Sequence, residues 1–337
     1  MATMQQVAER AGVSIATVSF VVNGTKHVTD ETRARVEAAM RDLGYARHHA
    51  ASALARGRTN ILALLYPALE SDLSGSGVQF FTGAAERARE RGYTLVLWPA
   101  RNDAGEIAEL TATGLVDGVV LMEVQLDDPR VDLLRASTTP FALIGRTADP
   151  SGTAWVDIDF EATVDDAVDR LVALGHRAIA YVEGEPDGRS SPHGGAARAH
   201  AAYLAAAARH GFAPRLLACA GDAGAGRSLA SRLVDEGSDA TALVVVNEHA
   251  APGILAELAQ RGRTIPADLS VLSIGTSPGA ADPALARMPS PGAELGRLGV
   301  DAVIDRIENP DRPLPQTLIP CGPPEGDSLG PAPRPAG

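Results

Sequence analysis

The chain has 337 residues, of which 45% are hydrophobic, 21% charged and 4% aromatic, with a formal net charge of −12. This length suits two or three globular domains, and the composition excludes a disordered or fibrous protein. No apolar run approaches the roughly 18 residues of a membrane span, the N-terminus is too charged for a signal peptide, and the two cysteines support neither a disulfide framework nor a metal site. We therefore predict a cytoplasmic protein with no membrane partner, no metal and no cofactor.

Charge is distributed unevenly along the chain. Residues 1–60 hold eight Lys/Arg and five Asp/Glu, so the rest of the chain carries all of the acidic excess. A basic N-terminal segment on an acidic body is the asymmetry expected when only that segment meets nucleic-acid phosphates.

Three short helices are predicted in the first 45 residues, over about 4–11, 15–22 and 30–43. A side chain that can cap a helix N-terminus precedes each of them, and glycine or Asn23-Gly24 follows; the caps are Thr3, Ser14 and Thr29. Apolar residues recur at helical spacing within each segment. Residues 1–45 should thus form a small helical domain, and the basic, alanine-rich residues 46–59 a linker.

The turn between the first two predicted helices favours a helix-turn-helix. Gly12 lies where the chain must reverse, and the second helix presents short polar and apolar side chains that can bond base edges or touch thymine methyl groups, namely Ile15, Ala16, Thr17, Ser19 and Phe20. The alternative is a helical bundle that merely caps a larger domain.

From Asn60 onward, apolar strand runs alternate with helical stretches. The predicted strands are 61–66, 93–98, 117–122, 141–145, 178–182, 242–246 and 269–274, and the helices are 77–92, 104–113, 161–175, 195–210, 223–236 and 249–261. This alternation is typical of parallel sheets covered on both faces. We predict two α/β lobes, one of residues 60–158 and 288–310 and the other of residues 159–287 and 311–329, with a disordered tail at 330–337; the glycine-rich stretches 193–195 and 221–226 are assigned to loops.

The segments VAERAGVS, ATVSFVVNG and VTDETRARVEAAMRDLGY, between Met4 and Tyr45, closely resemble the DNA-binding head of the lactose/galactose repressor family (LacI/GalR type). DGVVLM, PFALIGR, LGHRAIAYV, VVNE and IPADLSVLSIG follow in that family's order. The resemblance implies an all-α helix-turn-helix head joined to a two-lobe, periplasmic-binding-protein-like core of two doubly wound parallel sheets.

The resemblance also assigns DNA contacts. It implies that residues 48–56 form a hinge helix whose Leu54 inserts into the minor groove, where an apolar wedge kinks DNA. Tyr45-Ala46-Arg47-His48 lacks the family's usual proline, and Ser52 replaces a common arginine. The predicted DNA-binding set is Thr3, Ser14, Ile15, Ala16, Thr17, Ser19, Phe20, Asn23, Thr29, Tyr45, His48, Leu54 and Arg56.

Effector contacts are predicted from two sources. The resemblance places Arg198 near an effector-binding arginine and Asn247-Glu248 on a usual Asn-Asp pair, while Gly275-Thr276 stands where a carboxylate is usual. Aromatic residues at strand ends can stack on a sugar face, although core burial is the alternative, and Arg146 can bind ligand or pair with Asp149 or Asp157. The predicted set is Tyr66, Trp98, Arg146, Arg198, Asn247, Glu248 and Thr276, with Trp155, Phe80 and Phe81 as further stacking candidates.

Taken together, the sequence predicts a homodimeric transcriptional regulator, a repressor rather than an enzyme, that binds a near-palindromic operator in double-stranded DNA. A small-molecule effector, expected to be a carbohydrate, binds between the lobes and alters operator affinity. A non-sugar metabolite, an activator role and a periplasmic-type solute-binding protein are the alternatives. No acid–base pair or nucleophile motif supports catalysis.

Overall fold

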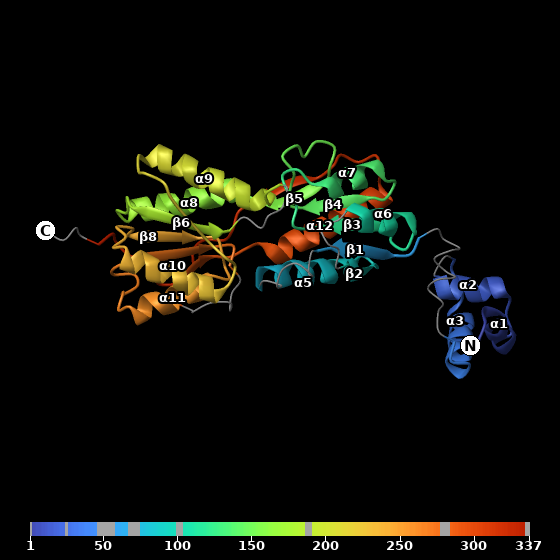
Figure 1. The fold of residues 1–337 in the computed structure, drawn as a ribbon. Coiled ribbons are helices and arrows are strands. Elements are labelled where there is room, and N and C mark those ends of the chain that lie inside the picture. Colours follow the sequence, from blue (N-terminus) through green and yellow to red (C-terminus); the bar gives the residue numbers. More distant parts are fainter. Residues whose placement is uncertain are drawn as a thin grey trace. The chain divides into compact units, whose positions relative to one another are not determined.

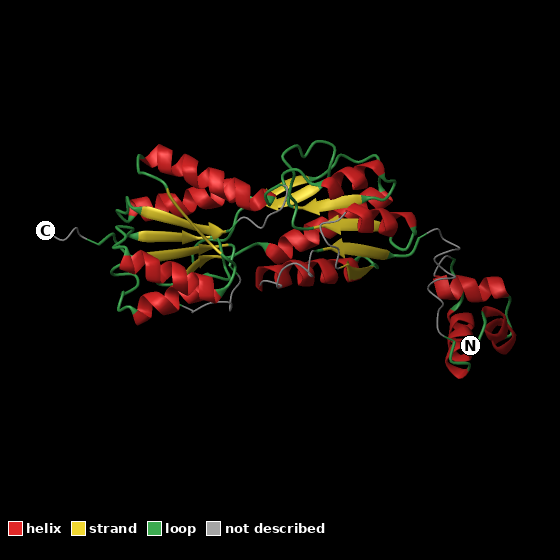
Figure 2. Cartoon of the chain, in the orientation of Figure 1, coloured by secondary structure: helices red, strands yellow, loops and turns green. Residues whose placement is uncertain are grey.

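The computed structural model describes residues 2–23, 26–45, 58–66, 75–98, 104–185, 191–276 and 284–333 (Figures 1 and 2). The chain divides into two compact units, residues 1–59 and 60–337. The N-terminal unit is helical, and the larger unit is built of two parallel sheets with helices on their faces.

The N-terminal unit contains α1 (Met4–Ala11), α2 (Ile15–Asn23) and α3 (Asp30–Asp42). Local capping explains where the helices begin: the Thr3 hydroxyl accepts from the Gln6 backbone N–H at 3.3 Å, and the Gln6 side chain accepts from the Thr3 N–H at 2.9 Å. Gly12, at φ 65°, supplies the left-handed residue that ends α1. The helices enclose one apolar core, formed by Val7, Ala8, Ala11, Val18, Val21, Val36 and Ala39.

The first lobe of the larger unit is a six-stranded parallel sheet in the order β11-β5-β4-β3-β1-β2. Its strands are β1 (Ile61–Leu65), β2 (Thr94–Trp98), β3 (Gly118–Leu121), β4 (Phe141–Ile144), β5 (Trp155–Ile158) and β11 (Gln316–Ile319). Its helices are α5 (Gly75–Glu90), α6 (Ala104–Ala112), α7 (Pro129–Ala136) and α12 (Gly292–Glu308).

The second lobe is a five-stranded parallel sheet in the order β10-β9-β8-β6-β7. Its strands are β6 (Ile179–Gly184), β7 (Arg215–Cys219), β8 (Ala242–Val245), β9 (Ser270–Ile274) and β10 (Ala286–Met288). Helices α8 (Phe160–Ala173) and α9 (Gly194–His210) lie on one face, and α10 (Ala223–Asp235) and α11 (Ala251–Gln260) on the other (Figure 1).

Alternation of side chains along the central strands explains why helices cover both faces. In β1, Leu62 and Leu64 belong to one buried apolar cluster, whereas Ala63 and Leu65 belong to another on the opposite face. Because successive side chains of a strand point to opposite faces, a continuous apolar run needs cover on both sides. The described helices supply that cover.

The structure corrects the predicted boundary near residue 311. Residues 316–319 form β11, which pairs with β5 in the first lobe, whereas the prediction gave all of 311–329 to the second lobe. The chain returns to the second lobe only afterwards, where Glu325 bridges Arg287. Neither β11 nor the return of the chain to the second lobe after it was predicted, because the segment 316–319 is short and only half-buried.

The predicted disorder of residues 330–337 is wrong for 330–333. The Gly330 N–H donates to the Ser270 hydroxyl at 3.0 Å, its carbonyl accepts from buried His176 at 3.0 Å, and the Ala332 N–H donates to the Leu174 carbonyl at 2.9 Å. Residues 334–337 lie outside the described part of the chain.

Two predicted loops are in fact helix starts. Gly194 and Gly195 begin α9 after the cap His193, and 223–226 begin α10 after the cap Asp222. Strands β5, β7, β10 and β11 and helices α7 and α12 were not predicted. Within the described residues, no helix is both long and apolar enough to cross a membrane.

Candidate functional site

The first candidate site is the surface of α2 in the helical unit. Ile15 is 49% exposed, Ala16 is exposed, and Thr17 and Ser19 are half-buried at the same helix. The Ser14 hydroxyl accepts from the Thr17 N–H at 3.1 Å, which fixes the first turn of α2. Ile15 and Ala16 thus lie on the open surface of the unit, as side chains that read DNA from the start of a recognition helix must.

The other predicted DNA-binding residues have different positions in the unit. Thr3 and Thr29 cap α1 and α3, and Tyr45 packs against the apolar core of the unit. Phe20 is half-buried, with the Lys26 ammonium 5.0 Å above its ring. Asn23 is the last residue of α2. The predictions for His48, Leu54 and Arg56 lie outside the described residues.

The second candidate site is a cavity of about 920 Å³ in the larger unit. Its described wall comes from both lobes, with Tyr66, Met122 and Asp157 from the first and Tyr181 and Ile274 from the second. Most wall residues lie at or just after carboxyl ends of parallel strands, which is where ligands bind in open α/β sheets. The volume suits a small organic molecule.

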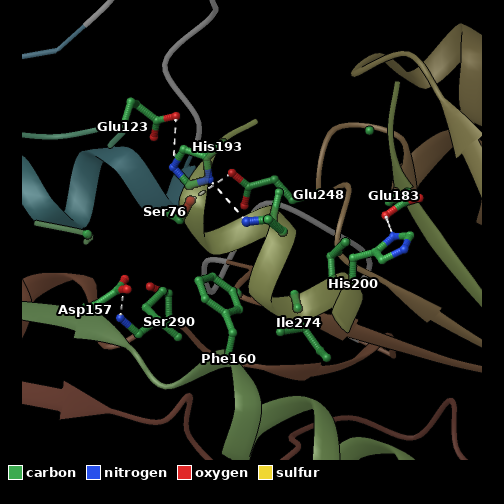
Figure 3. A pocket seen from close by; sticks show the side chains of 18 of the residues that line it. Ser76, Glu123, Asp157, Phe160, Glu183, His193, His200, Glu248, Ile274 and Ser290 are labelled. Carbon is green, nitrogen blue, oxygen red and sulfur yellow. Dashed lines mark hydrogen bonds and ion pairs between the residues drawn. The ribbon is translucent and has the colours of Figure 1, made fainter. Parts of the chain in front are cut away.

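Polar and aromatic side chains share this wall (Figure 3). Five carboxylates line it, namely Glu123, Asp157, Glu183, Glu185 and Glu248. His193 and His200 lie on α9 or at its start, and their ring nitrogens are 3.6 Å from Glu123 and 2.9 Å from Glu183, respectively. Tyr66, Phe80, Phe160 and Tyr181 add aromatic surface.

Arg198 of α9 joins the two lobes behind the cavity wall. Its Nη2 donates to the backbone carbonyls of Arg146 and Thr147, both at 2.9 Å, and its Nη1 lies 3.6 Å from Asp157. Arg146 donates to Asp157 at 3.2 Å and to Glu161 at 2.9 Å. Burial raises the pKa of Asp157, an effect that the two guanidinium groups oppose, and burial lowers the pKa of Arg198.

The start of α9 docks closely on the first lobe. The Gly194 N–H donates to the Val124 carbonyl at 2.8 Å, and the Leu126 N–H donates to the Pro192 carbonyl at 3.0 Å. A Cβ atom at Gly194 would lie 2.7 Å from the Arg146 carbonyl oxygen, so only glycine permits this approach. On a second path between the lobes, the Ser76 hydroxyl of α5 donates to Glu248 at 2.9 Å.

Three polar atoms of the wall are buried without a hydrogen-bond partner among the described residues. They are the Tyr181 hydroxyl, the Ser290 hydroxyl and Glu248 Oε2; Arg198 Nη1, just behind the wall, is a fourth buried atom of this kind. An unsatisfied buried polar group costs about 1–3 kcal/mol. The arrangement therefore suits a ligand rich in hydrogen-bonding groups.

The predicted effector residues are not all placed at the cavity. Tyr66 and Glu248 line it, and Tyr66 packs edge-on against Phe81, with ring centroids 5.2 Å apart. Arg146 and Arg198 lie behind its wall in the ion pairs described above. Trp98 packs with the core on the other face of the sheet.

Two further predicted residues have local structural partners instead. The Asn247 amide donates to the Cys219 and Ala220 carbonyls at 3.0 and 3.2 Å, and its oxygen accepts from the Ala250 N–H. Thr276 is buried and shares a hydrogen bond with the Ser273 hydroxyl. Trp155 is likewise buried, with the Arg146 guanidinium 5.5 Å from its ring centroid.

Sequence reasoning missed Ser76, Glu123, Glu183, His193, His200 and Ser290 as wall residues. Glu123 and Glu183 carried a usable signal, because each lies at the carboxyl end of a predicted strand. His193 and His200 are seven residues apart, which places them on one face of a helix, but that spacing was hidden while 193–195 was assigned to a loop.

The helix-turn-helix unit and the two-lobe core with its polar cavity together have the architecture of a ligand-responsive transcriptional regulator. Residues 3–48 match the family model "Bacterial regulatory proteins, lacI family", and residues 168–329 match "Periplasmic binding protein-like domain". The HTH-type transcriptional regulator CelR of Thermobifida fusca is 30% identical over 339 residues, which cover 94% of this chain and 96% of CelR. The chain therefore belongs to the lacI family of bacterial regulatory proteins and is a DNA-binding transcriptional regulator.

Other similarities agree with this assignment. AglR of Rhizobium meliloti (strain 1021), an HTH-type transcriptional regulator, is 36% identical over 187 residues, or 54% of this chain and 52% of AglR. The solved complex of the transcriptional regulator CelR with cellobiose has a TM-score of 0.66 at 26% identity, covering 94% of this chain and 96% of that one. The lac repressor dimer bound to operator and the anti-inducer ONPF has a TM-score of 0.81 at 24% identity, covering 96% and 97%, and shows the shared fold.

Proposed function

We propose that this protein is a homodimeric transcriptional repressor whose operator affinity is controlled by a carbohydrate bound in the cavity between the lobes. The observation that carries the proposal is the set of unpaired buried polar atoms at the cavity, namely the Tyr181 and Ser290 hydroxyls and Glu248 Oε2. A sugar offers several hydroxyl groups, each both donor and acceptor, and so matches a wall whose side chains carry unpaired donors and acceptors.

The aromatic part of the wall supports a carbohydrate over other polar ligands. Tyr66, Phe80 and Phe160 give apolar surface beside the polar atoms, and a sugar ring presents C–H faces as well as hydroxyls. The similar regulator CelR has been solved with cellobiose, and the ribose operon repressor of Escherichia coli (strain K12) is 28% identical over 319 residues. Both support a sugar-sized effector.

An exposed apolar sheet edge supports the homodimer. β2 is an edge strand, and its Val96 and Leu97 are 37% and 46% exposed, while Val78 of α5 is 45% exposed. Exposed apolar edge strands invite pairing with another chain unless they are covered. A second copy would cover this face and bring a second helix-turn-helix unit to the other half of a near-palindromic operator.

The proposed control works through the arrangement of the lobes. Ser76–Glu248 and the contacts of Arg198 and Gly194 link the lobes on separate paths. A ligand that inserts among these groups favours one lobe arrangement, and it shifts operator affinity only to the extent that it binds the two arrangements differently. Segment 46–59, with Leu54, would act as a hinge helix and transmit the change to the helix-turn-helix unit. The protein would act in the cytoplasm, where the operator is.

Tyr181→Phe tests the effector part of the proposal. The unliganded chain should be as stable as the parent or more so, because the variant removes an unpaired buried hydroxyl, but sugar affinity should fall at least tenfold. The matched control is Tyr203→Phe: its ring stacks on Tyr181 at 4.8 Å, but its hydroxyl donates to the Ile179 carbonyl at 2.8 Å. That control should lose stability and keep its affinity.

The measurement begins with a thermal-shift screen of mono- and disaccharides, cellobiose included, and calorimetry on the sugars that bind. Gel-shift titration on an operator selected from genomic fragments then measures the effect of the bound sugar on DNA affinity. Equal losses of sugar affinity in both tyrosine variants, or sugar binding that leaves operator affinity unchanged, would contradict the proposal.

A further inference from the structure

The electrostatic balance of the cavity wall bears on which effectors it can accept. Five carboxylates and two histidines line the cavity, and among its described wall residues there is no lysine or arginine. A site enclosed by low-dielectric protein strengthens the field of the charges that line it. The sign of those charges therefore selects among ligands.

The nearby guanidinium groups do not reverse that sign. Arg146 and Arg198 stand behind the wall, and Asp157 lies 3.2 and 3.6 Å from them, while Glu161 lies 2.9 Å from Arg146. Two cations and two carboxylates thus balance each other. Glu183 and Glu123 face His200 and His193, and no arginine or lysine of the described residues pairs with them.

Among the five carboxylates of the wall, Glu248 is the one with a buried oxygen that lacks a hydrogen-bond partner in the described structure. Ser76 donates to its Oε1 at 2.9 Å, and its Oε2 is buried without a hydrogen-bond partner in the described structure. No guanidinium or ammonium group forms an ion pair with it among the described residues. A hydroxyl or ammonium group of a ligand would satisfy Oε2, whereas a phosphate or carboxylate group would add a second anion to a partly desolvated one.

We infer that the cavity selects against anionic effectors, with Glu248 receiving a hydroxyl or ammonium donor from a neutral or amine-bearing sugar. Sugar phosphates and sugar acids are excluded by the negative charge of the cavity wall rather than by the size of the cavity. This inference rests on the proposed effector function of the same cavity, and it adds which chemical forms of the sugar the protein senses.

The test compares charge variants of the same parent compound on the full-length protein. Each parent sugar is measured by calorimetry with its monophosphate, its acid and its amino form; for cellobiose these are cellobiose phosphate, cellobionate and the glucosamine disaccharide. Adenosine and its monophosphate form a nucleoside series. The parent or amino form should bind at least tenfold more tightly than either anionic form of the same compound.

Glu248→Gln assigns the selectivity to one residue. The amide retains the size of the side chain and an acceptor oxygen but removes the charge, so the preference for neutral over anionic forms should shrink at least fivefold. Glu257→Gln is the matched control, since Glu257 is a carboxylate of α11 that pairs with Arg261 and is absent from the cavity wall. It should leave the preference unchanged.

The outcomes separate the inference from the proposed function. An anionic form that binds as tightly as its parent, or a Glu248→Gln variant with unchanged preference, overturns the inference while the effector function stands. If the nucleoside series binds and no sugar does, the carbohydrate proposal fails, and the charge preference is judged within that series. If no compound of any charge binds, both fail.

Discussion

Arg198→Ala should weaken the contact that holds the two lobes in their observed arrangement. The side chain is 11% exposed, and its Nη2 makes two hydrogen bonds of 2.9 Å to backbone carbonyls of the first lobe. Hydrogen bonds to charged groups contribute about 1.5–3 kcal/mol each, so their loss should cost the observed lobe arrangement about 3–6 kcal/mol. If the effector binds between the lobes as proposed, its dissociation constant should rise at least tenfold.

Two variants isolate this effect. Arg209→Ala removes another arginine of α9, but that side chain is 44% exposed and pairs with carboxylates on the surface, so effector affinity should not change. Arg198→Lys keeps the charge but loses the planar guanidinium, whose Nη2 donates to both carbonyls while its Nη1 lies near Asp157, and it should bind effector with intermediate affinity.

Calorimetry with the identified sugar and urea unfolding of the same preparations decide the question. Arg198→Ala should lose both effector affinity and stability, with operator binding in the absence of effector largely retained. Effector affinity within twofold of the parent, despite the lost hydrogen bonds, would show that Arg198 only stabilises the fold and that the cavity does not depend on this contact between lobes.

Three further predictions address other parts of the chain. Arg130→Met should lower the free energy of unfolding by about 3–5 kcal/mol in urea titrations, because it leaves the buried Asp128 carboxylate uncompensated, and Asp128→Asn added to it should recover part of the loss; equal stabilities of single mutant and parent would refute this. Burial lowers the pKa of His176 below its ordinary value, so the stability that the neutral ring contributes is present above about pH 6.5 and is lost as pH falls. Between pH 6 and 5 the free energy of unfolding of the parent should therefore fall by up to about 1.4 kcal/mol more per pH unit than that of His176→Gln. Parallel pH profiles of the two proteins would contradict this. Leu54→Ala should reduce specific operator binding strongly and non-specific binding little, whereas Arg56→Ala should weaken both, as measured by gel shifts at two salt concentrations; parent-like operator binding by Leu54→Ala would leave residues 46–59 as a tether only.

Local patterns in the sequence determined most of the fold. The helical unit follows from caps and apolar spacing over a few residues, and α1, α2 and α3 agree with the prediction to within one residue. The central strands follow from continuous apolar runs, because a strand covered on both faces has no polar positions. These features depend on interactions within one turn of helix or along one strand, which the sequence displays directly.

Tertiary structure decided which strands pair and which side chains meet. β11 is short and half-buried, and only its pairing with β5, more than 150 residues earlier, assigns it to the first lobe. Residues 330–333 look disordered by composition, yet contacts with His176 and Ser270 order them. Long-range hydrogen bonds of this kind leave no local pattern.

The residues of the candidate cavity were likewise only partly predictable from the sequence. Glu248 was predicted from the family resemblance and Tyr66 as an aromatic residue at a strand end, and strand ends gather at one edge of a parallel sheet. Asn247 also ends a strand, but its amide caps the neighbouring loop, and Arg198 reaches backbone carbonyls that no residue pattern encodes. The sequence alone determined the family, the helix-turn-helix and the two α/β lobes; the three-dimensional packing of the lobes decided which side chains line the cavity, because that depends on distances between segments far apart in the chain.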